Sequence, residues 1–271
     1  MSSATITATL SPAQIEKKSE DVAVSKTTSS NASAFALALL AGAFIGIGAT
    51  FMLVVKADSS LPFAVSTLLG GFSFLVGLFL VLAAGAELFT GDCLMVMGPL
   101  SGKVSWGRVV PRMALVYVGN LCGSLLMALL VLGAGTAGLN GGALGQAAVS
   151  VATGKVSMGW WTIFFRGILC NMLVCLAVWI GNSATSVTDR FFAALMPIMA
   201  FISCGFEHCV ANMFFLPYAC MLEAAGVASG SVNVGGVLYN LSASTAGNIV
   251  GGMVLVGVAY WVAYGRASKK G

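Results

Sequence analysis

Long apolar runs separated by short polar stretches dominate the chain after its first 33 residues. A membrane-spanning helix needs about 20 mostly apolar residues. Runs of this kind predict six spanning helices, which cover residues 34–55, 62–86, 110–134, 158–181, 191–222 and 243–264. A shorter apolar run over 93–100 cannot span a bilayer, and glycine-rich loops are expected at 135–155 and 223–242.

Polar residues interrupt this pattern twice. The sequence Glu87-Leu-Phe-Thr-Gly-Asp92 follows the second predicted helix, and Cys204-Gly-Phe-Glu-His-Cys209 lies inside the fifth. Irregular backbone at membrane depth is tolerated only where protein or water satisfies its polar groups. Broken segments in corresponding halves are also the best sequence indication of a transporter's central site. Both interruptions therefore predict loops that line a cavity, although 87–92 is also compatible with a simple interfacial turn.

A weak internal repeat supports two related halves. Gly119-Asn120 in the third helix is echoed by Gly247-Asn248 in the sixth, and each pair follows one interruption. Three spans per half give the halves opposite orientations, which is an inverted repeat. Small residues such as these glycines favour close helix packing. Buried amides need partners, so each asparagine is expected to bond to the nearby loop or to line the path.

The composition fits an all-α polytopic membrane protein, because 58% of the residues are hydrophobic and only 8% are charged. Soluble domains carry about 25% charged residues. The polar first 33 residues lack the apolar core of a signal peptide, and residues 13–24 are compatible with a short amphipathic helix. The seven cysteines have no CxxC spacing and read as reduced, buried side chains. No nucleic-acid partner is expected, whereas membrane lipid is.

The distribution of basic residues predicts the orientation in the membrane. With six spans both termini lie on one side, and ten lysines and arginines fall there, against two, Lys56 and Lys155, on the other. The positive-inside rule makes that side cytoplasmic. We therefore expect a multi-pass protein of the cytoplasmic (inner) membrane, with a cytoplasmic arm at 1–33, a transmembrane channel domain at 34–264 and a cytoplasmic tail at 265–271.

His208 is the only histidine, and it lies beside Glu207 in an otherwise apolar run. A lone histidine in a soluble core is most often a packing residue. Inside a membrane helix, an ionisable side chain favours a functional role, and histidine exchanges protons near neutral pH. A single histidine cannot build a metal site, so no metal or other cofactor is expected. Glu207 is expected to hold the loop by accepting hydrogen bonds from the backbone, Asn120 or Asn248.

Other polar side chains near the interruptions are weaker candidates. The Thr90 hydroxyl can donate to an anion, and Leu88 and Phe89 can form an apolar constriction. Lys155 either raises the anion concentration at the outer mouth or is a solvated loop lysine; both readings stay open. Arg166 lies deeper in the fourth helix and needs a partner, for which Glu87 and Glu207 are the candidates.

Four motifs make the chain resemble the formate/nitrite transporter family over about residues 14–264. They are Gly85-Ala-Glu-Leu-Phe-Thr-Gly91, the run from Asn171 to Trp179, Gly205-Phe-Glu-His-Cys-Val-Ala-Asn-Met213 and Gly247-Asn248. The resemblance implies an aquaporin-like protomer with helices two and five broken, in a homopentamer whose protomers each have a pore. It also implies transport of a small monovalent anion: formate, nitrite or hydrosulfide.

The resemblance also implies roles for individual residues. The family's central histidine falls on His208, and its flexible loop on Leu88, Phe89 and Thr90. The other correspondences are the constrictions Phe74, Leu78, Val174 and Phe201; the path-lining Asn171 and Asn248; Glu207 and Asn212 beside the histidine; and the vestibule lysines Lys155 and Lys26. Arg166 is a departure, because this position is apolar in the best-known formate channels.

A bare anion in an apolar constriction is poorly solvated, since a charge at membrane depth costs several kcal/mol. A weak acid avoids this cost by crossing as the neutral form. We therefore expect proton-coupled flux, with the proton taken from His208 or a connected water, and formate ahead of nitrite. A plain anion channel with a neutral His208 is the alternative. A water or small-neutral-solute channel lacks support because paired Asn-Pro-Ala motifs are missing, and an enzyme because no nucleophile–base pair is present.

Overall fold

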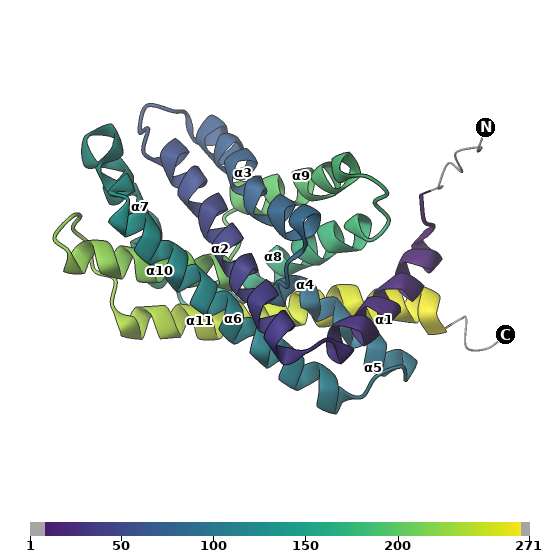
Figure 1. Cartoon of the computed structure of the whole chain (residues 1–271). Coiled ribbons are helices and arrows are strands. Elements are labelled where there is room, and N and C mark those ends of the chain that lie inside the picture. Colours follow the sequence, from purple (N-terminus) through teal and green to yellow (C-terminus); the bar gives the residue numbers. More distant parts are fainter. Residues whose placement is uncertain (1–8, 267–271) are drawn as a thin grey trace, which may run out of the picture.

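The computed structural model describes residues 9–266, which form helices joined by turns, without a strand in that range. The α-helices are α1 Pro12–Thr28, α2 Asn31–Lys56, α3 Phe63–Leu80, α4 Phe89–Asp92, α5 Met97–Ser101, α6 Trp106–Gly133, α7 Ala143–Val156, α8 Trp160–Gly181, α9 Val187–Ser203, α10 Cys209–Ala224 and α11 Val234–Ile249 (Figure 1). The remaining helical segments are π-helical at Val81–Gly85, Val250–Val258 and Trp261–Gly265 and 3-10 helical at Cys93–Val96 and Thr136–Gly142.

Five helices of the described chain are long and apolar enough to cross a membrane. They are Asn31–Lys56, Phe63–Gly85, Trp106–Gly133, Trp160–Gly181 and Val234–Gly265. Helix α10 is apolar but shorter, and it follows α9 after an interruption at 204–208. These helices fit the expectation of an all-helical, multi-pass membrane protein, and α1 covers the amphipathic segment predicted at 13–24.

One predicted loop is instead a helix. Residues 143–156, expected within a glycine-rich loop, form α7, and the last long helix begins at Val234 rather than near 243. Gly141 and Gly142, in the turn before α7, adopt positive φ angles of 63° and 91°, whereas Gly145 and Gly154 lie within the helix. The segment after this turn is rich in alanine and valine but too short to span. A rule based on span length therefore missed it.

Glycines bring two pairs of helices into backbone contact. Added Cβ atoms would overlap main-chain oxygens: that of Leu39 at Gly123, between α2 and α6, and that of Ile168 at Gly251, between α8 and the continuation of α11. Such contacts are typical of membrane helices, where small residues permit close approach. Each pair joins the first and third long helix of its half, as an internal repeat requires.

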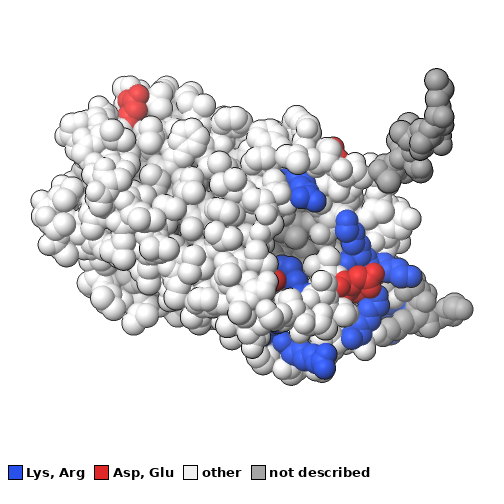
Figure 2. All heavy atoms as spheres, in the orientation of Figure 1, with Lys and Arg blue, Asp and Glu red and all other residues white. Residues whose placement is uncertain are grey.

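Charged residues gather at the end of the molecule that carries α1 and α5 (Figure 2). Lys103 pairs there with Glu20 and Asp21 of α1, and Arg112 of α6 donates to the carbonyl oxygen of Ser29 at 2.5 Å. These contacts fasten α1 across the ends of the long helices. The predicted tail at 265–271 lies almost wholly outside the described residues, as do residues 1–8 of the predicted arm.

Glu16 makes the docking of α1 sensitive to pH. Its carboxyl group is buried beneath α1, next to Glu20. Burial, followed by the hydrogen bond and negative charge of Glu20, raises the pKa of Glu16 from 4.5 to about 7. The docked state therefore binds a proton more tightly than the undocked state.

We predict that replacing Gly123 with alanine destabilises the protein by about 1–3 kcal/mol, because the new methyl group has no space beside the Leu39 carbonyl. Thermal unfolding of the detergent-solubilised protein measures the effect. Gly133→Ala is the matched control in the same helix, because a Cβ at Gly133 meets nothing within 4 Å. Equal melting temperatures for the two variants would contradict the close approach.

We predict that the contribution of Glu16 to the docking of α1 is fully present below about pH 4.5 and is lost as the pH rises through about 7, since the docked carboxyl of Glu16 must then lose its proton. Hydrogen exchange of the α1 amides, corrected for intrinsic rates, follows this change. Glu16→Gln should abolish the pH dependence, whereas Asp21→Asn, at a mostly exposed site, should retain it. Retention in both variants would refute the role of Glu16.

Candidate functional site

An asparagine from α6 holds the first interruption. After Gly85, whose φ is +83°, the chain is extended until α4 begins at Phe89. Asn120 Oδ1 accepts a hydrogen bond from Phe89 N–H at 2.9 Å, and its Nδ2 donates to the carbonyl oxygens of Glu87 at 2.9 Å and Ala38 at 2.8 Å. One buried amide thus satisfies main-chain groups on both sides of the interruption.

Asn248 repeats this arrangement at the second interruption. Its Oδ1 accepts from Cys209 N–H at 2.8 Å, and its Nδ2 donates to the carbonyl oxygens of Glu207 and Gly167, both at 2.8 Å. The expectation that each asparagine bonds to the nearby loop is confirmed. The internal repeat therefore extends from sequence to individual hydrogen bonds.

The two clamped loops bring Thr90 and His208 together. Thr90 Oγ1 lies 3.0 Å from His208 Nε2, and both side chains are buried. His208 also caps α10, because its Nδ1 accepts from Ala211 N–H at 3.0 Å. A neutral imidazole with an accepting Nδ1 carries its hydrogen on Nε2, so His208 donates to Thr90. The Thr90 hydroxyl hydrogen is then left to donate to a third group.

Apolar residues enclose this polar pair. The ring of Phe201 stacks on His208 with centroids 5.9 Å apart, and Phe74 meets Phe201 edge-on at 5.7 Å. Phe74, Leu78, Val174 and Phe201 are each about 1% exposed, so this part of the protein is closed. Phe89 points elsewhere and packs against Tyr117 with centroids 4.9 Å apart.

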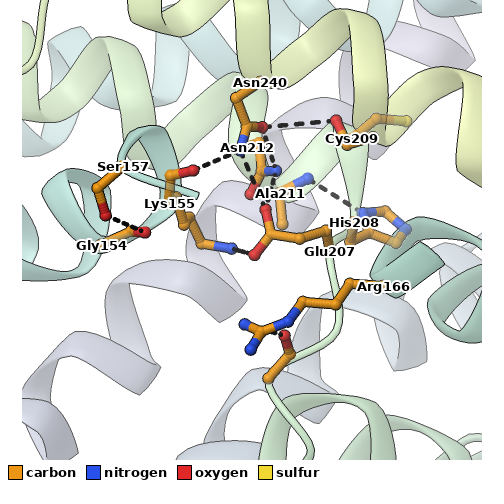
Figure 3. A network of polar contacts seen from close by, with 12 residues as sticks. Gly154, Lys155, Ser157, Arg166, Glu207, His208, Cys209, Ala211, Asn212 and Asn240 are labelled. Carbon is orange, nitrogen blue, oxygen red and sulfur yellow. Dashed lines mark hydrogen bonds and ion pairs between the residues drawn. The ribbon is translucent and has the colours of Figure 1, made fainter. Parts of the chain in front are cut away.

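Glu207 is the centre of a network at the α7 side of the site (Figure 3). Its carboxylate accepts from Lys155 Nζ at 2.7 Å, from Asn212 Nδ2 at 2.7 Å and from Asn240 Nδ2 at 3.2 Å. Of the two amides predicted to donate to Glu207, Asn248 does so, but to its main-chain carbonyl, whereas Asn120 donates to other main-chain groups. Lys155 belongs to α7 and forms an ion pair, so it is not a freely solvated loop lysine.

A second lysine–carboxylate pair lies at the α1 side. Lys26 of α1 donates to Asp92, the last residue of α4. Asp92 follows Glu87 by five residues (92 − 87), as Asn212 follows Glu207 (212 − 207), so the two ends are related but differ in charge. Asp92 and Asn240 were not among the site residues predicted from the sequence; the equal spacing after each glutamate is the signal that identifies Asp92.

Two cavities approach the polar pair from opposite sides. The α1 cavity has a volume of about 160 Å³ and is lined by residues that include Lys26, Leu88 and Asp92. The α7 cavity has a volume of about 450 Å³, and Phe201 and His208 are among its lining residues. The closed region around Thr90 and His208 therefore has one cavity next to it on the α1 side and another on the α7 side.

Asn171 and Cys175 of α8 also contact the centre, and Cys175 was not predicted from the sequence. Asn171 Nδ2 donates to the Asn248 carbonyl at 2.7 Å and contacts Cys93 Sγ at 3.3 Å. Cys175 Sγ donates to the Thr90 carbonyl at 3.2 Å. These contacts brace the Thr90 loop from α8. No cluster of three or more potential metal ligands occurs among residues 9–266.

Arg166 does not pair with a carboxylate. Its Nη1 donates to the carbonyl of Gly205 at 3.2 Å, and no ion pair involves it within the described part of the chain. The prediction of Glu87 or Glu207 as its partner was wrong. Glu207 is already engaged by Lys155, which reaches it from α7, a helix separated from α8 by a turn.

The chain is similar to known channels over nearly its whole length. The sequence profile of the formate/nitrite transporter family matches residues 13–262. The formate channel FocA of Escherichia coli (strain K12) is 36% identical over 95% of both chains, and the nitrite transporter NirC of Salmonella typhimurium is 34% identical over 85% of this chain and 82% of its own. These relatives are named as a channel and a transporter rather than as enzymes, as predicted from the sequence.

A solved structure agrees with this result. A pentameric formate channel with formate bound superposes with a TM-score of 0.81 at 39% identity, covering 86% of this chain and 97% of that one. Together, the profile, the relatives and this superposition show that the chain belongs to the formate/nitrite transporter family.

Proposed function

We propose that the protein is a channel for a small monovalent anion, with formate as the first candidate substrate. The observation that carries this proposal is the buried Thr90–His208 pair next to two cavities, each with lysine among its lining residues. The names of the relatives and of the solved structure, which include formate and nitrite, support the substrate class.

In the proposed mechanism the anion reaches the centre from either cavity and accepts the hydrogen bond that the Thr90 hydroxyl has available. His208 Nε2–H strengthens this donor by donating to Thr90 Oγ1. A proton then converts the anion into its neutral acid, which passes the ring of Phe74, Leu78, Val174 and Phe201. The neutral form avoids the cost of moving a charge through an apolar constriction.

The proton has two possible sources in this proposal, His208 itself or a water connected to it. As a donor from Nε2 alone, His208 keeps its cap on α10. Carrying a second proton requires Nδ1 to release Ala211 N–H. If His208 carries the second proton, the hydrogen bond that caps α10 must therefore break, whereas a water as the source leaves it intact. A mutation of His208 can separate the two sources.

Nitrite is the second candidate, because it has the same charge as formate and a similar size, and a relative bears its name. Hydrosulfide is the third. A water or small-neutral-solute channel is a weaker alternative, because lysine side chains line both cavities.

We further propose the assembly and orientation of the channel. Six spans result if α9 and α10 act as one broken helix, and α3 with the segment 86–101 as another. The α1 end then faces the cytoplasm across the inner membrane, with both termini, an arm at 1–33, a channel domain at 34–264 and a tail at 265–271. Five protomers form the channel, each with its own path, as in the related pentameric structure.

We predict that formate flux into proteoliposomes rises as the pH falls from about 7 to about 5, because more substrate crosses as the neutral acid. Stopped-flow measurements with formate, nitrite, hydrosulfide and nitrate test this. Nitrate is the control, since it is the anion of a strong acid and should pass slowly at each pH. Nitrate flux equal to formate flux throughout this range would exclude the neutral-acid route and favour a plain anion channel.

We predict that His208→Phe lowers formate flux by about tenfold or more, since a lost polar group in a desolvated path costs about 1–3 kcal/mol. His208→Gln separates the two proton sources, because glutamine can donate a hydrogen bond but does not titrate. Wild-type pH dependence in His208→Gln places the proton on water, and its loss places the proton on His208. Normal flux in His208→Phe would return His208 to a packing role.

We predict that Thr90→Val lowers flux by a similar factor, about tenfold, because valine keeps the shape of threonine but has no hydroxyl group for the anion. Thr90→Ser keeps the hydroxyl and should retain most of the flux. The same stopped-flow assay applies to both variants. If valine and serine behave alike, the hydroxyl does not contact the substrate.

A further inference from the structure

The α7 cavity is lined by positively charged side chains that have no role in the mechanism proposed above. Four charged side chains line it: Lys56, Lys155, Arg166 and Glu207. Lys155 is bound to Glu207 at 2.7 Å, so these two charges offset each other. Lys56 and Arg166 provide the remaining positive charge of this cavity.

Lys56 and Arg166 have no acidic partner within ion-pair distance in the described range 9–266. Lys56, the last residue of α2, donates to Ser66 Oγ at 3.3 Å. Arg166 Nη1 donates one hydrogen bond to the Gly205 carbonyl. A guanidinium has five N–H donors, so this contact uses only one of them. The Arg166 side chain is exposed and extends toward the same region as the amino group of Lys155 (Figure 3).

The position of Arg166 argues against a role in packing alone. It lies two turns inside α8, one of the apolar membrane-crossing helices, where a charged side chain is costly unless it faces water or a partner. The α7 cavity, which Lys155 and His208 also line, provides such a place. The contact with Gly205 fixes the guanidinium at the rim of the loop that ends at His208.

We propose that Arg166, assisted by Lys56, is a binding station that holds the anion in the α7 cavity before it reaches Thr90 and His208, and that it favours anions with two oxygens. This inference rests on the proposed anion transport and adds a selectivity residue to it. A guanidinium presents paired N–H groups that match the two oxygens of formate or nitrite. Hydrosulfide has a single acceptor atom and cannot use both donors.

The test compares charge with shape at one position. Formate and hydrosulfide fluxes are measured as a function of concentration at low ionic strength for wild type, Arg166→Gln and Arg166→Lys. Arg166→Gln should raise the half-saturating formate concentration by about three- to tenfold and weaken its dependence on salt, with little change in maximal flux. Arg166→Lys keeps the charge but loses the paired donors. Compared with Arg166→Gln, it should therefore bring the half-saturating concentration closer to the wild-type value for hydrosulfide than for formate.

Arg108→Gln is the matched control, because it removes the same charge from an exposed arginine of α6 outside this cavity. It should leave the half-saturating concentrations of both anions unchanged. Lys56→Gln should produce a smaller shift in the same direction as Arg166→Gln, for both anions, because a lysine has no planar fork.

Three results would overturn the proposal. Unchanged half-saturation in Arg166→Gln removes the binding station. If Arg166→Gln lowers the maximal flux but leaves the half-saturating concentration unchanged, Arg166 only stabilises the loop at Gly205. Equal shifts for formate and hydrosulfide in Arg166→Lys and Arg166→Gln eliminate the preference for two oxygens. If the wild-type protein carries none of the anions, the proposed function fails instead, and the two failures are therefore distinguishable.

Discussion

Two buried amides hold the functional part of the molecule in place. A helix interrupted at membrane depth leaves main-chain groups without partners, and water cannot satisfy them in an apolar bundle. Asn120 and Asn248 each make three hydrogen bonds to main-chain groups, two at one interruption and one on a neighbouring long helix. The loops are thereby fixed so that Thr90 and His208 lie 3.0 Å apart. The close approach of α2 to α6, and of α8 to α11, places each asparagine within reach of its loop.

The two halves repeat this architecture but not its charges. Asp92 with Lys26 occupies the α1 side, where the equivalent position on the α7 side is Asn212 beside Glu207 and Lys155. Each lysine is therefore paired with a carboxylate and lines a cavity beside the closed centre. The polar centre itself presents hydrogen-bonding groups rather than a full positive charge.

The sequence predicted the features that follow from short-range rules. The apolar runs located the long helices, and Gly119-Asn120 and Gly247-Asn248 located the clamps. Partner choice depends on three-dimensional proximity, which is why Arg166 was assigned the wrong partners and the partners of the Glu207 carboxylate were not predicted. Asn240 lies 33 residues after Glu207 (240 − 207) in an ordinary apolar context, and nothing local indicates its hydrogen bond to that carboxylate. Helix α7 was missed because its composition resembles that of a loop and its length is below that of a span.

Under the proposed mechanism, the same asymmetry determines where selection occurs. The Thr90–His208 pair can donate to any small anion, so the centre alone separates substrates poorly. Its apolar surround selects for weak acids, because only these can shed their charge on the way. Discrimination by shape requires a rigid donor with a defined geometry, and Arg166 is the side chain of the α7 cavity that has one. Selection by acidity at the centre and by shape at the entrance then act on different properties of the substrate. A change at Arg166 should accordingly alter which anion enters without altering the pH dependence of its passage.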